Sequence, residues 1–166
     1  MTSTWTPEQV MQRLARIPDP EIPVISLLDL GIVRDVRREG ELCVVTITPT
    51  YSGCPAMYEI TRMIEEALHE EGLDQVRVDT QLSPAWTTDW MSEQGRQALR
   101  GYGISPPAQR SVDISGLLRQ PEAPVVACPQ CGSTHTRVIS QFGSTPCKAL
   151  YRCISCGEPF DYFKAH

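Results

Sequence analysis

The amino-acid sequence predicts an α/β (α+β) protein in which a small α/β sandwich precedes a separate metal-binding domain. Helix-type and strand-type patterns alternate through residues 1–103, whereas residues 104–124 are rich in proline and have little periodicity, as is typical of a linker. Residues 125–166 contain two closely spaced cysteine pairs. A chain of 166 residues with 41% hydrophobic content is long enough for one ordinary domain and a small one.

The first predicted element is a helix that begins after Thr6. Proline follows Thr6 at once and Gln9 comes three residues later, which is the pattern of a capping box with proline at the first helical position. Apolar residues then recur at helical spacing as far as Ile17. Three prolines within residues 18–23 end this helix and stiffen the loop that follows it.

Two strands follow, over residues 32–36 and 42–48, and a short polar turn joins them into a predicted hairpin. Cys43 lies in the second strand, where we expect it to be a small buried hydrophobic residue. A loop over residues 49–55 then leads to the next helix.

The remaining elements of the first domain alternate in type. An apolar stripe from Met57 to Leu68 predicts a helix that ends near Glu71, before a glycine. A third strand is predicted over 76–82 and a further helix over 87–100. This order of helices and strands favours helices packed on one small sheet.

The strongest chemical signal is a set of four cysteines near the C-terminus. Cys128 and Cys131 form one CxxCG motif, and Cys153 and Cys156 form a second, with 21 residues between the two. Each motif places two thiolates on one tight loop, and two such loops complete a tetrahedral four-sulfur site. Zinc prefers this geometry and these ligands, so we expect a structural zinc ion and a zinc-ribbon domain.

Cys54 is the second candidate for a functional thiol. It precedes Pro55, which is expected at the first position of the helix, so Cys54 would be the N-cap. Backbone N–H groups and the helix dipole at that place favour the thiolate, the form that attacks substrates and binds metals. Gly53 permits a tight turn or the close approach of a ligand, and hydroxyl groups such as that of Thr50 lie nearby. Simple capping by Cys54 is the alternative.

Asp19 and Glu21 lie on the proline-stiffened loop, which holds their carboxylates in place. A rigid pair of carboxylates can bind a hard metal ion or orient a thiol. Such residues can equally cap a turn or face solvent, and the sequence leaves these alternatives open.

Two segments resemble the MIP18-like family. Residues 19–33 (DPEIPVISLLDLGIV) are similar to its opening motif, and residues 48–57 (TPTYSGCPAM) to its threonine-rich GCP loop. The resemblance covers residues 7–90 and implies a small α/β domain that helps to mature iron-sulfur clusters on other proteins. It also implies functional roles for the motif positions Asp19, Glu21, Thr50, Gly53 and Cys54.

The second half resembles the D-protein family of bacterial phenylacetate degradation. The segments that carry this resemblance are 86–90 (WTTDW), 101–107 (GYGISPP) and 142–151 (FGSTPCKALY). It implies a non-catalytic accessory protein that works beside the phenylacetyl-CoA epoxidase, a di-iron oxygenase with an iron-sulfur reductase. Assembly or metal loading of that enzyme, with transient iron or an iron-sulfur cluster as cargo, is the implied role.

Two competing functions are compatible with the same residues. The chain could be a purely structural subunit of the oxygenase complex, or an enzyme that uses Cys54 as a nucleophile, although no histidine is placed in sequence as its base. Cys147, between the zinc motifs, is either an unliganded cysteine or a thiolate that joins Cys54 in a transient metal site.

Composition bounds the partners and the compartment. The net charge of −5 and the lack of a long basic run argue against a general nucleic-acid or membrane surface. The N-terminus lacks a secretory signal pattern, and four of the seven cysteines have metal-binding spacing, so a reducing cytoplasm is expected.

Overall fold

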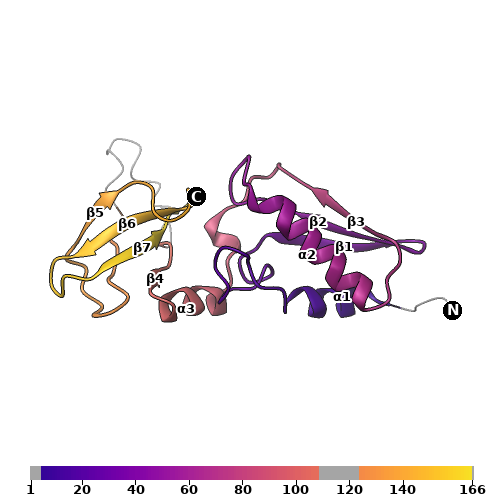
Figure 1. Cartoon of the computed structure of the whole chain (residues 1–166), viewed down its shortest axis with the longest axis horizontal. Helices are drawn as coiled ribbons and strands as arrows, with labels where there is room; N and C mark the ends of the chain where they lie inside the picture. The colour runs from indigo at the N-terminus through magenta and orange to yellow at the C-terminus, as the bar shows by residue number, and fades with distance from the viewer. Residues whose placement is uncertain (1–4, 109–123, 166) are drawn as a thin grey trace, which may run out of the picture. The chain divides into compact units, whose positions relative to one another are not determined.

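The computed structural model describes residues 5–108 and 124–165 and divides the chain into two compact units, Met1–Gly95 and Arg96–His166. Each unit has its own sheet. The two units are drawn in Figure 1 and are described separately below.

The first unit contains a three-stranded sheet with the order β1-β2-β3. Strands β1 (Val33–Glu39) and β2 (Leu42–Ile47) form the predicted hairpin, and β3 (Val76–Thr80) pairs parallel to β2. Because parallel neighbours need a crossover connection, the chain passes from β2 to β3 through helix α2 (Ala56–Glu70), which Figure 1 shows against the sheet.

Apolar side chains of this sheet and its helices form the core of the first unit. Strand β2 is buried along almost its whole length, and Cys43 is fully buried within it, as predicted. Helix α1 (Pro7–Leu14) contributes Val10 and Leu14, and its capping box is present as expected, with Thr6 and Gln9 bonded reciprocally. Helix α2 buries Ile60, Ile64 and Leu68.

The predicted helix over residues 87–100 is interrupted. A short 3₁₀ helix, η1 (Thr88–Trp90), is followed by an extended Met91, and α3 (Glu93–Gly101) then begins anew. Ser92 explains the break, because its hydroxyl accepts a hydrogen bond from the Gly95 N–H at 2.9 Å and donates one to Asp29 at 2.6 Å. A capping side chain that is fixed by a distant carboxylate starts a new helix at this point.

The second unit contains a four-stranded sheet with the order β4-β7-β6-β5. Its strands are β4 (Ile104–Ser105), β5 (Thr136–Ser140), β6 (Lys148–Cys153) and β7 (Pro159–Phe163). The sequence predicts a linker over residues 104–124. The start of this segment is a strand instead, because Ile104 and Ser105 pair with β7. Residues 109–123 of that predicted linker lie outside the described residues.

A small core holds the second sheet together. Its buried residues are Val126, Cys128, Ala149, Cys153, Phe160 and Tyr162. Two of these six are cysteines of the CxxCG motifs, so hydrophobic packing and the predicted metal site share the same centre.

Within the described residues, no helix is both long enough and apolar enough to cross a bilayer.

Candidate functional site

The four cysteines of the two CxxCG motifs come together as predicted. All four sulfur atoms lie within 4.8 Å of one another. The Cys128 and Cys156 sulfurs are 3.8 Å apart, and those of Cys131 and Cys153 are 3.6 Å apart. A tetrahedral zinc site with Zn–S bonds of about 2.3 Å has sulfur–sulfur edges of about 3.8 Å. The donor set and its size therefore fit one zinc ion.

The backbone of each motif forms the same kind of turn. The N–H of Gly132 donates to the Cys128 carbonyl at 2.9 Å, and the N–H of Gly157 donates to the Cys153 carbonyl at 3.0 Å. Both glycines have positive φ angles, +73° and +82°, which residues with a Cβ rarely adopt. The glycine after each CxxC is thus required by the turn that presents the two thiols.

The four thiols change one another's acidity. The backbone N–H of Cys156 is the main cause that lowers the pKa of Cys153, to about 7. The pKa of Cys156 rises to about 12, because burial and contacts with the other thiols outweigh a hydrogen bond from the Glu158 N–H. Four thiols this close cannot all ionise unless a cation lies among them, and a zinc ion bound there would supply that charge.

Cys54 lies on the loop between β2 and α2, but it is not the N-cap of the helix. Pro55 is the N-cap, with helical φ and ψ angles of −67° and −21°, and α2 begins at Ala56. Cys54 therefore precedes the cap by one residue and is half-buried. Its carbonyl accepts a hydrogen bond from the Met57 N–H, and its own N–H donates to the Tyr51 carbonyl.

The expectation that Cys54 is unusually acidic is wrong. Burial raises the pKa of the Cys54 thiol above its ordinary value, and the negative charges of Glu21 and Asp19 raise it further. Hydrogen bonds from the Ala56 N–H and from the Tyr51 hydroxyl lower the pKa but do not outweigh burial. The helix start lowers the pKa less than burial raises it, because partial burial of the sulfur removes water that would stabilise the thiolate.

The same interactions show which predicted residues the fold brings together. Glu21 and Asp19 lie on a loop more than thirty residues earlier in the sequence, and their negative charges raise the pKa of the Cys54 thiol. Asp19 is buried, and one of its carboxylate oxygens accepts hydrogen bonds from the N–H groups of Glu21 and Ile22, at 2.9 and 2.8 Å. Asp19 thus also caps its own turn, whereas Glu21 is exposed.

The rest of the loop has distinct roles. Gly53 has a φ of +82°, which the turn requires, and no heavy atom of the described residues lies within 4 Å of its missing Cβ; close approach of a ligand to Gly53 stays a prediction. Thr50 is half-buried. Tyr51 is one of the hydroxyl-bearing residues expected beside Cys54, and a hydrogen bond from its hydroxyl lowers the pKa of the Cys54 thiol.

Cys147 lies in the second unit and is not one of the four clustered cysteines. It is buried just before β6, and its sulfur is 3.0 Å from the Thr145 hydroxyl oxygen. Its part in metal transfer stays a prediction.

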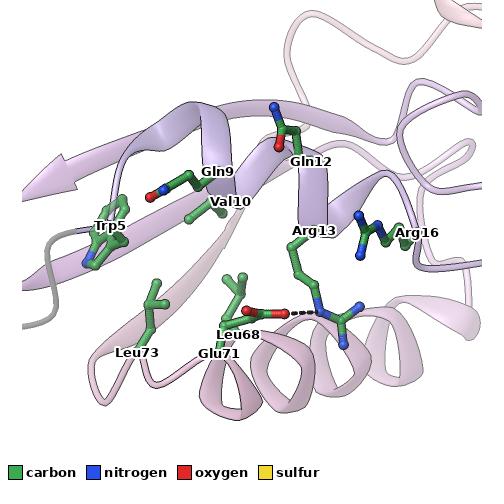
Figure 2. A pocket seen from close by; sticks show the side chains of 9 residues that line it. All are labelled: Trp5, Gln9, Val10, Gln12, Arg13, Arg16, Leu68, Glu71 and Leu73. Carbon is green, nitrogen blue, oxygen red and sulfur yellow. Dashed lines mark ion pairs between the residues drawn. The ribbon is translucent and has the colours of Figure 1, made fainter.

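A pocket of about 370 Å³ lies between α1 and the C-terminal end of α2. Figure 2 shows Trp5 at one end of it and Arg13 and Arg16 at the other, with Arg13 paired to Glu71. Leu68, in its wall, is about 18 Å along the helix from Ala56, so this pocket is separate from the Cys54 loop.

Comparison with known proteins identifies both parts of the chain. Residues 7–84 match the family model described as iron-sulfur cluster assembly protein, and residues 115–164 match the PaaD zinc beta ribbon domain. A protein of Escherichia coli (strain K12), provisionally named as a subunit of 1,2-phenylacetyl-CoA epoxidase, is 53% identical over 98% of this chain and 96% of its own length. The chain belongs to the family of this epoxidase subunit, the D-protein family.

Other similar proteins match about half of this D-protein family member. An Fe-S protein maturation auxiliary factor of Porphyromonas gingivalis is 37% identical over 54% of the chain and 86% of its own length. A crystal structure of a DUF59 domain from Bacillus anthracis has a TM-score of 0.53, with 26% identity, and covers 56% of this chain and 90% of the other. The MIP18-like fold predicted for the first unit is thereby confirmed.

Proposed function

We propose that this chain is an accessory factor that matures an iron centre or iron-sulfur cluster of the phenylacetyl-CoA epoxidase system and takes no part in turnover. The proposal draws on membership of the D-protein family, and on the names of the Fe-S maturation relatives that share the first unit. In this proposal Cys54 holds the iron or cluster as cargo, and the zinc ion of the second unit is structural.

The surroundings of Cys54 are the observation that carries the proposal. The charges of Asp19 and Glu21 oppose ionisation of the thiol in the absence of a cation. The same charges attract a metal ion, and a metal ion bound to sulfur replaces the proton that the carboxylates help to retain. The thiol is therefore protected as S–H at rest and becomes a thiolate ligand when the cargo arrives.

Reversible binding follows from this arrangement. A single half-buried cysteine beside an exposed carboxylate gives a cargo ion few protein ligands. Such an incomplete site suits transfer to a client with more ligands, whereas the four-cysteine site of the ribbon suits permanent retention.

The test is coexpression of the epoxidase components with this chain or with its Cys54→Ser variant, followed by iron counting on each purified component. We expect one component to lose most of its iron with Cys54→Ser. The matched control is Cys43→Ala, which removes a buried thiol from the core and should lower stability while leaving iron loading intact. Full iron loading with Cys54→Ser would refute the proposal.

A second experiment separates maturation from the role of a structural component. Epoxidase made without this chain should stay inactive when the purified chain is added to the assay, because the missing metal was not loaded in the cell. Restoration of full turnover by simple addition would identify the chain as a working part of the enzyme instead.

A further inference from the structure

The second unit has an exposed apolar strip along its edge strand. Among the described residues, strand β5 is the last strand of the sheet and pairs with β6 on one side only, as Figure 1 shows. Val138 and Ile139, both in β5, expose 43% and 52% of their surface. Edge strands with unpaired backbone groups and apolar side chains are templates for pairing with another chain, and proteins usually protect them.

Further exposed apolar residues extend this strip beyond both ends of β5. Phe142 follows the strand and is 67% exposed, while Ile154 is held beside its start by a hydrogen bond from the Ile154 N–H to the His135 carbonyl. We call Val138, Ile139, Phe142 and Ile154 the β5 edge patch. Exposed apolar side chains that line one strand in this way mark an interaction site more often than scattered ones do.

Three charged residues near the patch are basic, while the acidic Asp161 lies near Gly143, beside Phe142. Arg137 lies within β5 and faces Arg152 across the ladder with β6, and the Lys164 ammonium lies 4.7 Å from the centre of the Phe142 ring. Among the described residues, Arg137 makes no ion pair. The surroundings of the patch therefore favour a partner with negative charge.

The two units have net charges of opposite sign, which favours binding of a negatively charged partner to the second unit. Residues 5–95 contain seven arginines and sixteen carboxylate side chains, a formal charge of −9, whereas the described residues of the second unit, 96–108 and 124–165, contain six basic and two acidic side chains, a formal charge of +4. An acidic segment is repelled by the first unit and attracted by the second.

We propose that the β5 edge patch docks an extended, acidic segment of a client protein, which adds to the sheet as a strand beside β5. Strand addition supplies main-chain hydrogen bonds, and the patch supplies apolar contacts for alternate side chains of the segment. This proposal deepens the proposed function and rests on it for the identity of the client, one of the epoxidase components. Docking by the second unit would leave Cys54 of the first unit to handle the cargo.

The test measures copurification of the coexpressed epoxidase components with the full-length chain. Ile139→Glu should reduce copurification about tenfold or more, because it removes an apolar contact and adds a charge that repels an acidic segment. The matched control is Leu82→Glu, the same kind of change at an exposed position of the first unit, which should bind as the unchanged chain does. One zinc ion per chain in each variant verifies that the ribbon is folded.

Arg137→Glu gives a second measurement that leaves apolar packing untouched. It should also weaken copurification, and added salt should weaken binding of the unchanged chain, since both reduce the attraction of opposite charges. On binding, the amide hydrogens of β5 should exchange more slowly. The proposal is wrong if both patch variants bind normally with their zinc in place, or if protection appears elsewhere and not in β5.

Cys54→Ser distinguishes this proposal from the proposed function. That variant should copurify normally and fail to load iron. Normal iron loading by Cys54→Ser would refute the maturation role, whereas docking would still be decided by the patch variants.

Discussion

Loss of one zinc ligand should unfold the second unit and leave the first unit folded. Cys156→Ser is the informative change, because Cys156 is exposed and its removal disturbs packing less than removal of the buried Cys128 or Cys153. The buried cluster around the cysteines contains six residues, two of them predicted metal ligands, so the packing at this centre depends on the ion. Structural zinc stabilises small domains by about 10–16 kcal/mol. That is comparable to the whole stability of an ordinary domain, about 5–15 kcal/mol.

Two probes can follow the units separately. All three tryptophans, Trp5, Trp86 and Trp90, lie in the first unit, so their fluorescence reports on that unit alone. Amide hydrogen exchange in β6 and β7 reports on the second unit. We expect Cys156→Ser to lose zinc and the protection of both strands, with unchanged tryptophan fluorescence.

The neighbouring Ser155→Ala is the control for this experiment. It removes only the contact between the Ser155 and Ser133 hydroxyls, which are 2.8 Å apart, and should keep one zinc ion per chain. Protected β6 and β7 amides in zinc-free Cys156→Ser would show that packing alone holds the ribbon, and would refute the expected dependence on zinc.

Four further predictions concern the first unit. Burial raises the pKa of Cys43 from 9.0 to about 11, so the free energy of unfolding should be unaffected by this thiol below pH 9 and should fall as pH rises toward 11. Urea unfolding should show this fall in the unchanged chain and not in Cys43→Ala. Cys54 should react with iodoacetamide more slowly than a free cysteine at pH 8, and Glu21→Gln should accelerate it by lowering the pKa; an unchanged rate would contradict the charge argument. Leu68→Ala should cost about 2–5 kcal/mol in urea unfolding, because Leu68 is fully buried. Gly31→Ala should cost at least about 1–2 kcal/mol, since φ is +82° and the new Cβ would lie 2.7 Å from the Trp90 carbonyl oxygen; an unaltered urea midpoint would refute this.

Local features were predictable because they depend on neighbours in sequence. The capping box at Thr6 and Gln9 needs only residues three apart, and the structure contains it. The β1–β2 hairpin needs only two strand patterns and a turn. The cluster of four cysteines was also predictable, since each CxxCG motif forms its own turn and two such turns can share one ion.

The acidity of Cys54 was not predictable from its local sequence. A proline after cysteine indicated a helix start, and a helix start indicated a low pKa. The pKa rises instead, because burial and two carboxylates from a distant loop act on the sulfur. Desolvation and charge depend on what packs around an atom, and residues that are remote in sequence supply both.

The clustering of the four cysteines and the class of fold could be read from the order of amino acids. Three other features became visible only in the folded chain: the charges of Asp19 and Glu21 raise the pKa of Cys54, Ser92 separates η1 from α3, and Ile104 and Ser105 form a strand. These features share one physical reason. Each depends on a contact between segments far apart in the chain, and such contacts are chosen by the packing of the whole unit rather than by the preferences of neighbouring residues.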